Sequence, residues 1–140
     1  MNSKKVIDNI DSIKICPGIF QKEIEKLFEI RVTTGGKKIF SVKIDSQNRD
    51  DTKLDWRRNQ FQLSYSIFEL PRKMKNLINH MITKLGLHYS AYDFIFTPNE
   101  EFYFLEVNPG GQWLWLEKEI GLQISKALAE YMISGKPDMK

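Results

Sequence analysis

Apolar and polar positions alternate over residues 27–33, which is the pattern of a β-strand with one buried face. The apolar side chains that share this face are Phe28, Ile30 and Val32. Gly35-Gly36 follows as a turn signal, and residues 39–44 supply a second apolar run. This part of the sequence therefore predicts a β-hairpin.

Two further apolar runs, residues 89–96 and 102–107, are separated by a short polar turn and predict a second hairpin. Centring the turn on residues 99–100 pairs Thr97 with Phe102. This pairing fixes the register of every other residue in the hairpin, since side chains alternate between the two faces of a strand.

Helical spacing appears in two stretches. Pro71 suits the first turn of a helix, and the apolar residues of 74–85 then recur three or four positions apart until Gly86 ends the pattern. A second helix is predicted over residues 120–134, where it is followed by Gly135.

The remaining segments predict less regular structure. Residues 4–14 indicate a short helix, Pro17-Gly18 breaks it, and residues 19–21 are typical of a short strand. Residues 45–60 are polar without periodicity and predict a long loop, followed by an extended piece within 61–68. Antiparallel hairpins packed by helices predict the α+β class.

The chain has 140 residues, of which 41% are hydrophobic and 28% charged, so one globular core is expected. Cys16 is the only cysteine, which excludes an intrachain disulfide and a cysteine-rich metal site. No apolar run is long enough for a membrane span, and we expect a cytoplasmic setting. The net charge of +3 favours an anionic ligand such as a nucleotide, although a solvated surface explains it equally well.

Two carboxylates interrupt the second hairpin. Asp93 and Glu106 lie inside apolar strands, where carboxylates are depleted, and the expected register places them opposite each other. Asn108 falls on the same face as Glu106, opposite the small Ala91. Oxygen ligands gathered in this way suit Mg²⁺. The alternative is that both acids face solvent or pair with Lys and Arg, and the pattern alone leaves both open.

The string from Glu106 to Trp113, together with Asp93, resembles the metal-binding end of the ATP-grasp superfamily. The resemblance implies that Asp93, Glu106 and Asn108 hold two Mg²⁺ ions against the β- and γ-phosphates of ATP. The longer string from residue 104 is most similar to the graspetide (microviridin-type) ligases, which join peptide side chains by ω-ester or ω-amide bonds.

Residues 17–21 and 28–33 resemble the hinge strand and the next strand of this family. The resemblance implies that Lys22, Glu23 and Ile24 contact the adenosine of ATP, and that Arg31 contacts and stabilises the transferring phosphoryl group. The family usually has an acidic residue where Lys22 stands, so the ribose contact passes to Glu23 or is absent.

A third match concerns the peptide substrate. Asp55-Trp56-Arg57 resembles a signature of the same ligases near the substrate peptide, which implies this role for Asp55 and Arg57. Taken alone, the tripeptide favours a turn aspartate beside an exposed arginine, and the ordered series of matches along the chain reverses this preference. Trp113 and Trp115 alternate after the glycine pair and predict either an aromatic wall for the peptide or core packing.

The resemblance implies a Mg²⁺- and ATP-binding part of a ligase that activates a peptide carboxylate as an acyl phosphate. We expect residues 17–137 to form the C-terminal subdomain, after a helical segment over 1–16. The family's N-terminal and central lobes have no counterpart here, so we expect a fragment or a chain completed by a partner.

The expected partner is a peptide or protein substrate, not a nucleic acid or a membrane. The alternatives are a ligase that adds glutamate, a non-catalytic peptide-binding remnant and a plain interaction domain.

Overall fold

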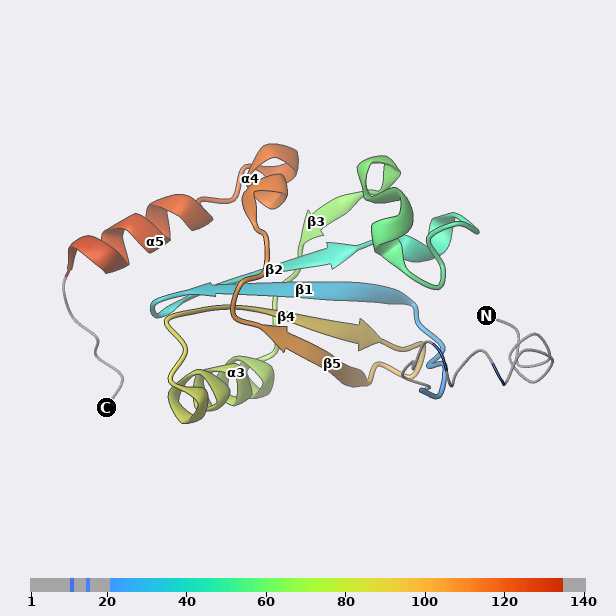
Figure 1. The fold of residues 1–140 in the computed structure, drawn as a ribbon, viewed down its shortest axis with the longest axis horizontal. Helices are drawn as coiled ribbons and strands as arrows, with labels where there is room; N and C mark the ends of the chain where they lie inside the picture. Colours follow the sequence, from blue (N-terminus) through green and yellow to red (C-terminus); the bar gives the residue numbers. More distant parts are fainter. Residues whose placement is uncertain (1–10, 12–14, 16–20, 135–140) are drawn as a thin grey trace.

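A computed structural model describes Asp11, Ile15 and residues 21–134 of the chain (Figure 1). Its strands are β1 (Phe28–Gly35), β2 (Lys38–Ile44), β3 (Tyr65–Ile67), β4 (Tyr89–Phe96) and β5 (Phe102–Asn108). Its helices are the 3₁₀ helices η1 (Ser46–Asn48) and η2 (Trp56–Gln62) and the α-helices α3 (Arg72–Leu85), α4 (Leu114–Ile120) and α5 (Ile124–Ile133). The helix predicted over residues 4–14 and the Gly135 terminator lie outside the described residues, apart from Asp11.

The five strands form one antiparallel sheet in the order β3-β2-β1-β4-β5. The predicted hairpin of β1 and β2 is confirmed, with Gly35 opposite Lys38 at the turn. Residue 21, the only described part of the strand predicted over 19–21, lies in an irregular segment before β1. Because β1 is central, all of its residues are buried.

The second hairpin is confirmed, but its turn differs from the prediction. Glu100 has a left-handed φ of 61°, and Phe102 pairs with Phe96 instead of Thr97. The Thr97 amide donates to the Glu101 carbonyl, which leaves a loop of three residues in place of the two-residue turn that was predicted. The longer loop shifts the pairing of the two strands by one residue. Leu105 is then bulged out of the ladder, which restores the predicted register beyond it.

One face of the sheet is covered by α3, which lies below the sheet in Figure 1. The predicted helix is confirmed, and Gly86 ends it in the left-handed conformation with φ 64°. Ile78 and Ile82 of this helix pack against apolar side chains of β1 and β4. The buried residues of this cluster are Phe28, Ile30, Val32, Leu70, Ile78, Ile82, Tyr92 and Phe94.

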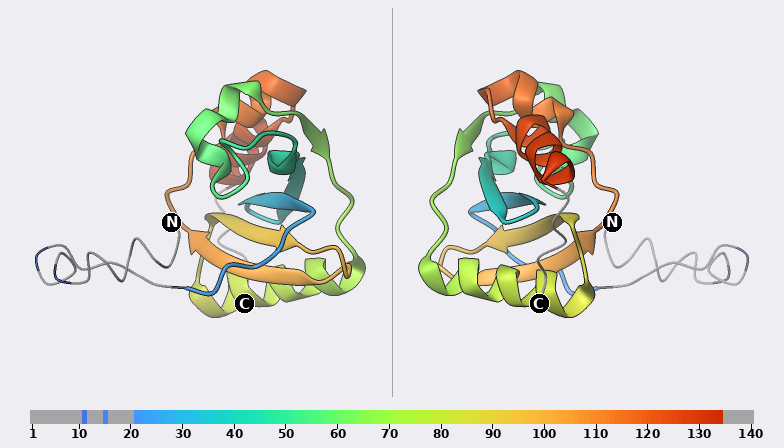
Figure 2. Two further views of the ribbon diagram at one scale, coloured as in Figure 1. Left: turned by 90° about the vertical axis from the view of Figure 1, so that its right-hand side faces the viewer. Right: turned by 90° about the vertical axis from the view of Figure 1, so that its left-hand side faces the viewer.

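The opposite face is covered by α4, α5 and the segment that carries η1 and η2 (Figure 2). Its fully buried centre consists of Val42, Leu116 and Ile124. The sheet is therefore sandwiched between two helical layers. The α+β prediction is confirmed.

Two predicted segments differ from the structure. The helix expected over 120–134 is present as α5 but begins only at Ile124, because Gly121 adopts a left-handed φ of 70° and ends a separate helix, α4, which was not predicted. The loop expected over 45–60 contains η1 and the start of η2, and the extended piece over 61–68 is a strand only at Tyr65–Ile67. No helix within the described residues is long and apolar enough to cross a membrane.

Candidate functional site

A row of charged side chains crosses three neighbouring strands. Arg31 of β1 pairs with Asp93 of β4, and Asp93 pairs with Glu106 of β5. Paired residues project from the same face of a sheet. The predicted opposition of Asp93 and Glu106 is therefore confirmed as a register, and Arg31 extends the row.

Arg31 and Asp93 form an ion pair. One guanidinium nitrogen, Nη1, lies 2.9 Å from Oδ1 and 2.7 Å from Oδ2 of Asp93. Only 8% of the Arg31 side chain and 14% of the Asp93 side chain are exposed. Of the two opposed carboxylates, Asp93 is thus neutralised by Arg31, whereas Glu106 is exposed to solvent. Of the alternatives that the sequence left open, pairing with arginine applies to Asp93 and solvent exposure to Glu106.

The chain turns back over this face immediately after β5. The side-chain oxygen of Asn108 accepts a hydrogen bond from the Gly110 amide at 2.9 Å. Gly111 is buried so closely that a Cβ there would lie 2.6 Å from the Ala91 Cβ and 2.7 Å from Arg31 Nη2. The Tyr89 hydroxyl donates to the Gly111 carbonyl. Only glycine fits this crossing, which also packs against the Arg31 guanidinium.

The turn at residues 55–57 lies near the same row. The Asp55 carboxylate accepts from the Arg57 backbone amide at 3.1 Å and from its Nε at 2.9 Å. This hydrogen bond raises the pKa of Arg57, and the charges of Glu106 and Asp93 raise it further. Because these charges act on Arg57 through space, the turn lies within electrostatic range of Asp93 and Glu106.

The tryptophans mainly pack. Trp56 is buried and lies 5.3 Å, between ring centroids, from Trp115 of α4. Trp113 is half-buried, lies 5.3 Å from the Tyr89 ring, and donates from Nε1 to Ser125 at 3.0 Å. Both packing arrangements fix the backbone around residues 108–116 above the charged row.

The predicted nucleotide-contacting residues lie in the irregular segment before β1. Lys22 and Glu23 are exposed and Ile24 is half-buried. Among the described residues, no hydrogen bond or ion pair joins these three to the charged row. Their nucleotide role stays a prediction.

Sequence reasoning missed two buried charges. Glu29 lies on the face of β1 that carries Arg31, and burial raises its pKa. Lys26 forms an ion pair with it. The available signal was the alternation itself, because a carboxylate two residues before Arg31 must share its face.

The oxygen atoms of Asp93, Glu106 and Asn108 are of the kind that a hard divalent cation binds. Within the described part of the chain, no three His, Cys, Asp or Glu side chains form a group that would hold a metal ion. The candidate set is instead two carboxylates and an amide oxygen, Asp93, Glu106 and Asn108, a set that leaves coordination positions for phosphate oxygens.

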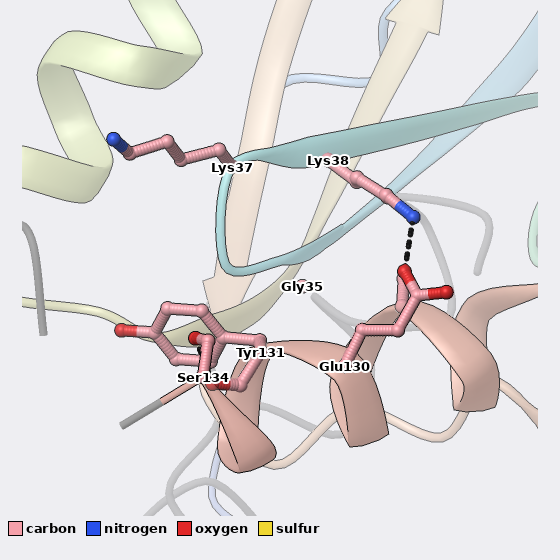
Figure 3. Close-up of a pocket in the computed structure, with 7 residues that line it drawn as sticks. Gly35, Lys37, Lys38, Glu130, Tyr131 and Ser134 are labelled. Atoms are coloured by element: carbon pink, nitrogen blue, oxygen red, sulfur yellow. Dashed lines mark hydrogen bonds and ion pairs between the residues drawn. The ribbon is translucent and has the colours of Figure 1, made fainter. Parts of the chain in front are cut away.

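A surface hollow lies elsewhere, between the β1–β2 turn and α5 (Figure 3). Lys38 and Glu130 form an ion pair of 2.6 Å at its rim, and both are about half exposed. None of the predicted site residues lines it. The hollow therefore has no part in the charged row.

Comparison with solved structures gives long matches. The chain is 31% identical to the Chryseobacterium gregarium RiPP-associated ATP-grasp ligase solved with ADP and a leader and core peptide, with a TM-score of 0.89 over 100% of this chain. It is 35% identical to the macrocyclase MdnC bound with precursor peptide MdnA from Microcystis aeruginosa MRC, with a TM-score of 0.81 over 95% of this chain. The ligase PsnB, solved with a precursor variant, Mg and ADP, shares the fold at 17% identity and a TM-score of 0.75, over 96% of this chain.

These matches cover only 43%, 41% and 41% of the three ligases, so the chain spans about two fifths of their length. No family model and no curated protein sequence matched the chain. The predicted resemblance to ATP-grasp ligases is confirmed, since the chain shares the fold of about two fifths of each of these ligases. Two of the three matches are to a RiPP-associated ligase and to a macrocyclase, the peptide-modifying kind of ATP-grasp ligase that the sequence resembles.

Proposed function

We propose that this chain is the Mg²⁺- and nucleotide-binding C-terminal part, residues 17–137, of a graspetide-type ATP-grasp ligase that acts in the cytoplasm. The observation that carries the proposal is the row of Arg31, Asp93 and Glu106 on one face of the sheet. The matched ligases, two of them solved with ADP and all three with precursor peptides, support the same assignment.

In the proposed site, Asp93, Glu106 and Asn108 hold Mg²⁺, whose chemistry there is the neutralisation of phosphate charge. Arg31 lies next to Asp93 and donates hydrogen bonds to the transferring phosphoryl group. These residues position the reactants and supply charge, and no general base among them is required for the first step. Residues 22–24 contact adenosine.

The proposed reaction has two steps. A side-chain carboxylate of the peptide attacks the γ-phosphorus of ATP, and the bond from this phosphorus to the ADP oxygen breaks, giving an acyl phosphate. A hydroxyl or amine of a second side chain then attacks the acyl carbon, and phosphate leaves. The product is an ester or amide cross-link, and the proton of the attacking group is released. Asp55, Arg57 and Trp113 are the residues we assign to the peptide.

A second candidate is a peptide-binding module without catalysis. The observation that favours it is the exposure of Lys22 and Glu23, which no described contact joins to the charged row. The two candidates differ in one measurable property, because only the first requires Mg²⁺-dependent nucleotide binding.

The test is calorimetric titration of the chain with ADP, with and without Mg²⁺. We expect binding that needs Mg²⁺ and is lost in Glu106→Gln, since the substitution removes a charged oxygen ligand. Glu101→Gln is the matched control, because Glu101 is an exposed carboxylate of the same hairpin outside the row. Binding that survives Glu106→Gln would contradict the metal assignment. No nucleotide binding by the folded wild type would favour the peptide-binding module.

A further inference from the structure

Lys26 and Glu29 form a nearly buried ion pair at the beginning of β1, outside the residues that the proposed reaction uses. Their side chains are 10% and 7% exposed. One carboxylate oxygen of Glu29, Oε2, is buried without a hydrogen-bond partner. Burying a charge pair is costly, and a pair that is only weakly satisfied contributes little to stability. This pair therefore suggests a role beyond holding the fold together.

The ammonium group of Lys26 has a second partner in a distant segment. Its Nζ donates to the Leu54 carbonyl at 3.1 Å, across 28 positions of the sequence. Leu54 immediately precedes the turn at residues 55–57. Lys26 thus connects the segment that leads into β1 with the backbone that carries Asp55 and Arg57.

The turn itself is held by its own hydrogen bonds and by packing. The Arg57 and Arg58 amides bond to Asp55, and Trp56 packs on Trp115. These contacts lie within the turn or lead to α4, and a second connection runs through η1, which contacts β1 and bonds to Thr52 and Lys53 before the turn. The contact of Lys26 with the Leu54 carbonyl joins the turn to this strand.

We propose that Lys26 is a positioning residue, which holds the 55–57 turn in a fixed position relative to β1 and so fixes how strongly the Arg57 charge acts on Asp93 and Glu106. The inference rests on the proposed function for the binding of Mg²⁺, but not for the contact between Lys26 and the Leu54 carbonyl. Lys26 is also two residues from Ile24, in the segment assigned to the nucleotide. A shift of that segment would therefore be transmitted to Arg57.

The first experiment measures amide hydrogen exchange of residues 54–58 in the ligand-free chain. In Lys26→Met we expect about tenfold faster exchange there, because the turn loses its link to β1. Lys26→Arg keeps a cationic donor and should restore most of the protection. Lys53→Met is the matched control, since the side chain of this exposed lysine pairs, among the described residues, with Asp50 alone.

Lys26→Met leaves Glu29 buried without its cation, so a second pair of variants separates positioning from folding. Glu29→Gln retains the Lys26 contact with Leu54, whereas Lys26→Met with Glu29→Gln loses it without leaving a buried charge. Of these two variants, we expect the amides of the turn to exchange faster than in the wild type only in the double variant. Equal exchange in the two variants, or wild-type exchange in Lys26→Met, would overturn the proposal.

The second experiment titrates the same variants with Mg²⁺ alone. Arg57→Gln removes a cation that acts on the two carboxylates through space, so Mg²⁺ should bind about threefold tighter. Lys26→Met should give part of this gain and Lys53→Met less than that. In the Arg57→Gln background, Lys26→Met should add no more than Lys53→Met does. Additive effects would overturn the proposal. If the wild type binds no Mg²⁺, the metal assignment fails, and hydrogen exchange alone decides the role of Lys26.

Discussion

Replacing Gly111 by alanine would place a methyl group against two atoms that have little room to move. The new Cβ would lie 2.6 Å from the Ala91 Cβ, which is fixed to the β4 backbone, and 2.7 Å from Arg31 Nη2. Both distances are below those that carbon and nitrogen atoms tolerate, so either the crossing must lift or Arg31 must leave Asp93. Overpacking of this kind costs about 1–3 kcal/mol.

For a chain of this size, that loss lowers Tm by roughly 3–10 °C. Thermal unfolding followed by circular dichroism would measure it, and calorimetry would show whether Mg²⁺-dependent ADP binding falls in parallel. Gly110→Ala is the matched control, because its Cβ would meet only the Asn108 side-chain oxygen, at 3.7 Å. If Gly111→Ala is as stable as Gly110→Ala and binds ADP as well, the close crossing over Arg31 does not exist in solution.

Three further predictions follow from the same contacts. Arg31→Met leaves the Asp93 carboxylate buried without its partner, and urea unfolding should show a loss of about 3 kcal/mol; an unchanged midpoint would contradict the buried ion pair. Burial raises the pKa of Glu29 above 4.5, so the carboxyl group keeps its proton to higher pH in the folded chain than in the unfolded chain. The resulting contribution of Glu29 to the free energy of unfolding is fully present below pH 4.5 and is lost as pH rises through the pKa of the folded chain. Glu29→Gln should remove this fall in the free energy of unfolding, and parallel pH profiles would show that Glu29 is not buried. In Gly86→Ala the new methyl group meets no atom of the described residues within 4 Å, but the alanine is forced to φ 64°, so urea unfolding should show a loss of about 1 kcal/mol, and no loss would contradict the left-handed helix end.

The second hairpin could be predicted because its two strands are neighbours in sequence and their alternation is clear. Its turn could not, because the left-handed residue is Glu100, where no glycine or asparagine signals it. The error of one residue at Phe102 was cancelled by the bulge at Leu105, so the opposition of Asp93 and Glu106 was correct. A bulge depends on local packing that alternation does not reveal.

The helix α4 was missed because its apolar residues mislead. Trp113 and Trp115 alternate as in a strand, yet Trp115 lies in α4 and packs on Trp56 and Tyr65. Contacts between segments so far apart in sequence decide the structure of this short helix. Local propensity has little influence over so few residues.

The ion pair of Arg31 and Asp93 also could not be predicted from the sequence. The two residues are 62 positions apart, and they meet only because β1 pairs with β4 across the middle of the sheet. Pattern reasoning placed each on a strand and required some compensation for two opposed carboxylates. It could not identify which cation would supply it, since strand order is not encoded in alternation.

The most direct test of the account is to locate a bound divalent cation. Mn²⁺ would replace Mg²⁺ in a titration of the ¹⁵N-labelled chain with ADP, and the paramagnetic broadening of backbone amides would be mapped. The account predicts that broadening centres on residues 91–93 and 106–112 and disappears in Glu106→Gln. Broadening centred elsewhere, for example on the exposed acids of residues 50–51, would contradict the assignment of Asp93, Glu106 and Asn108 as the metal site.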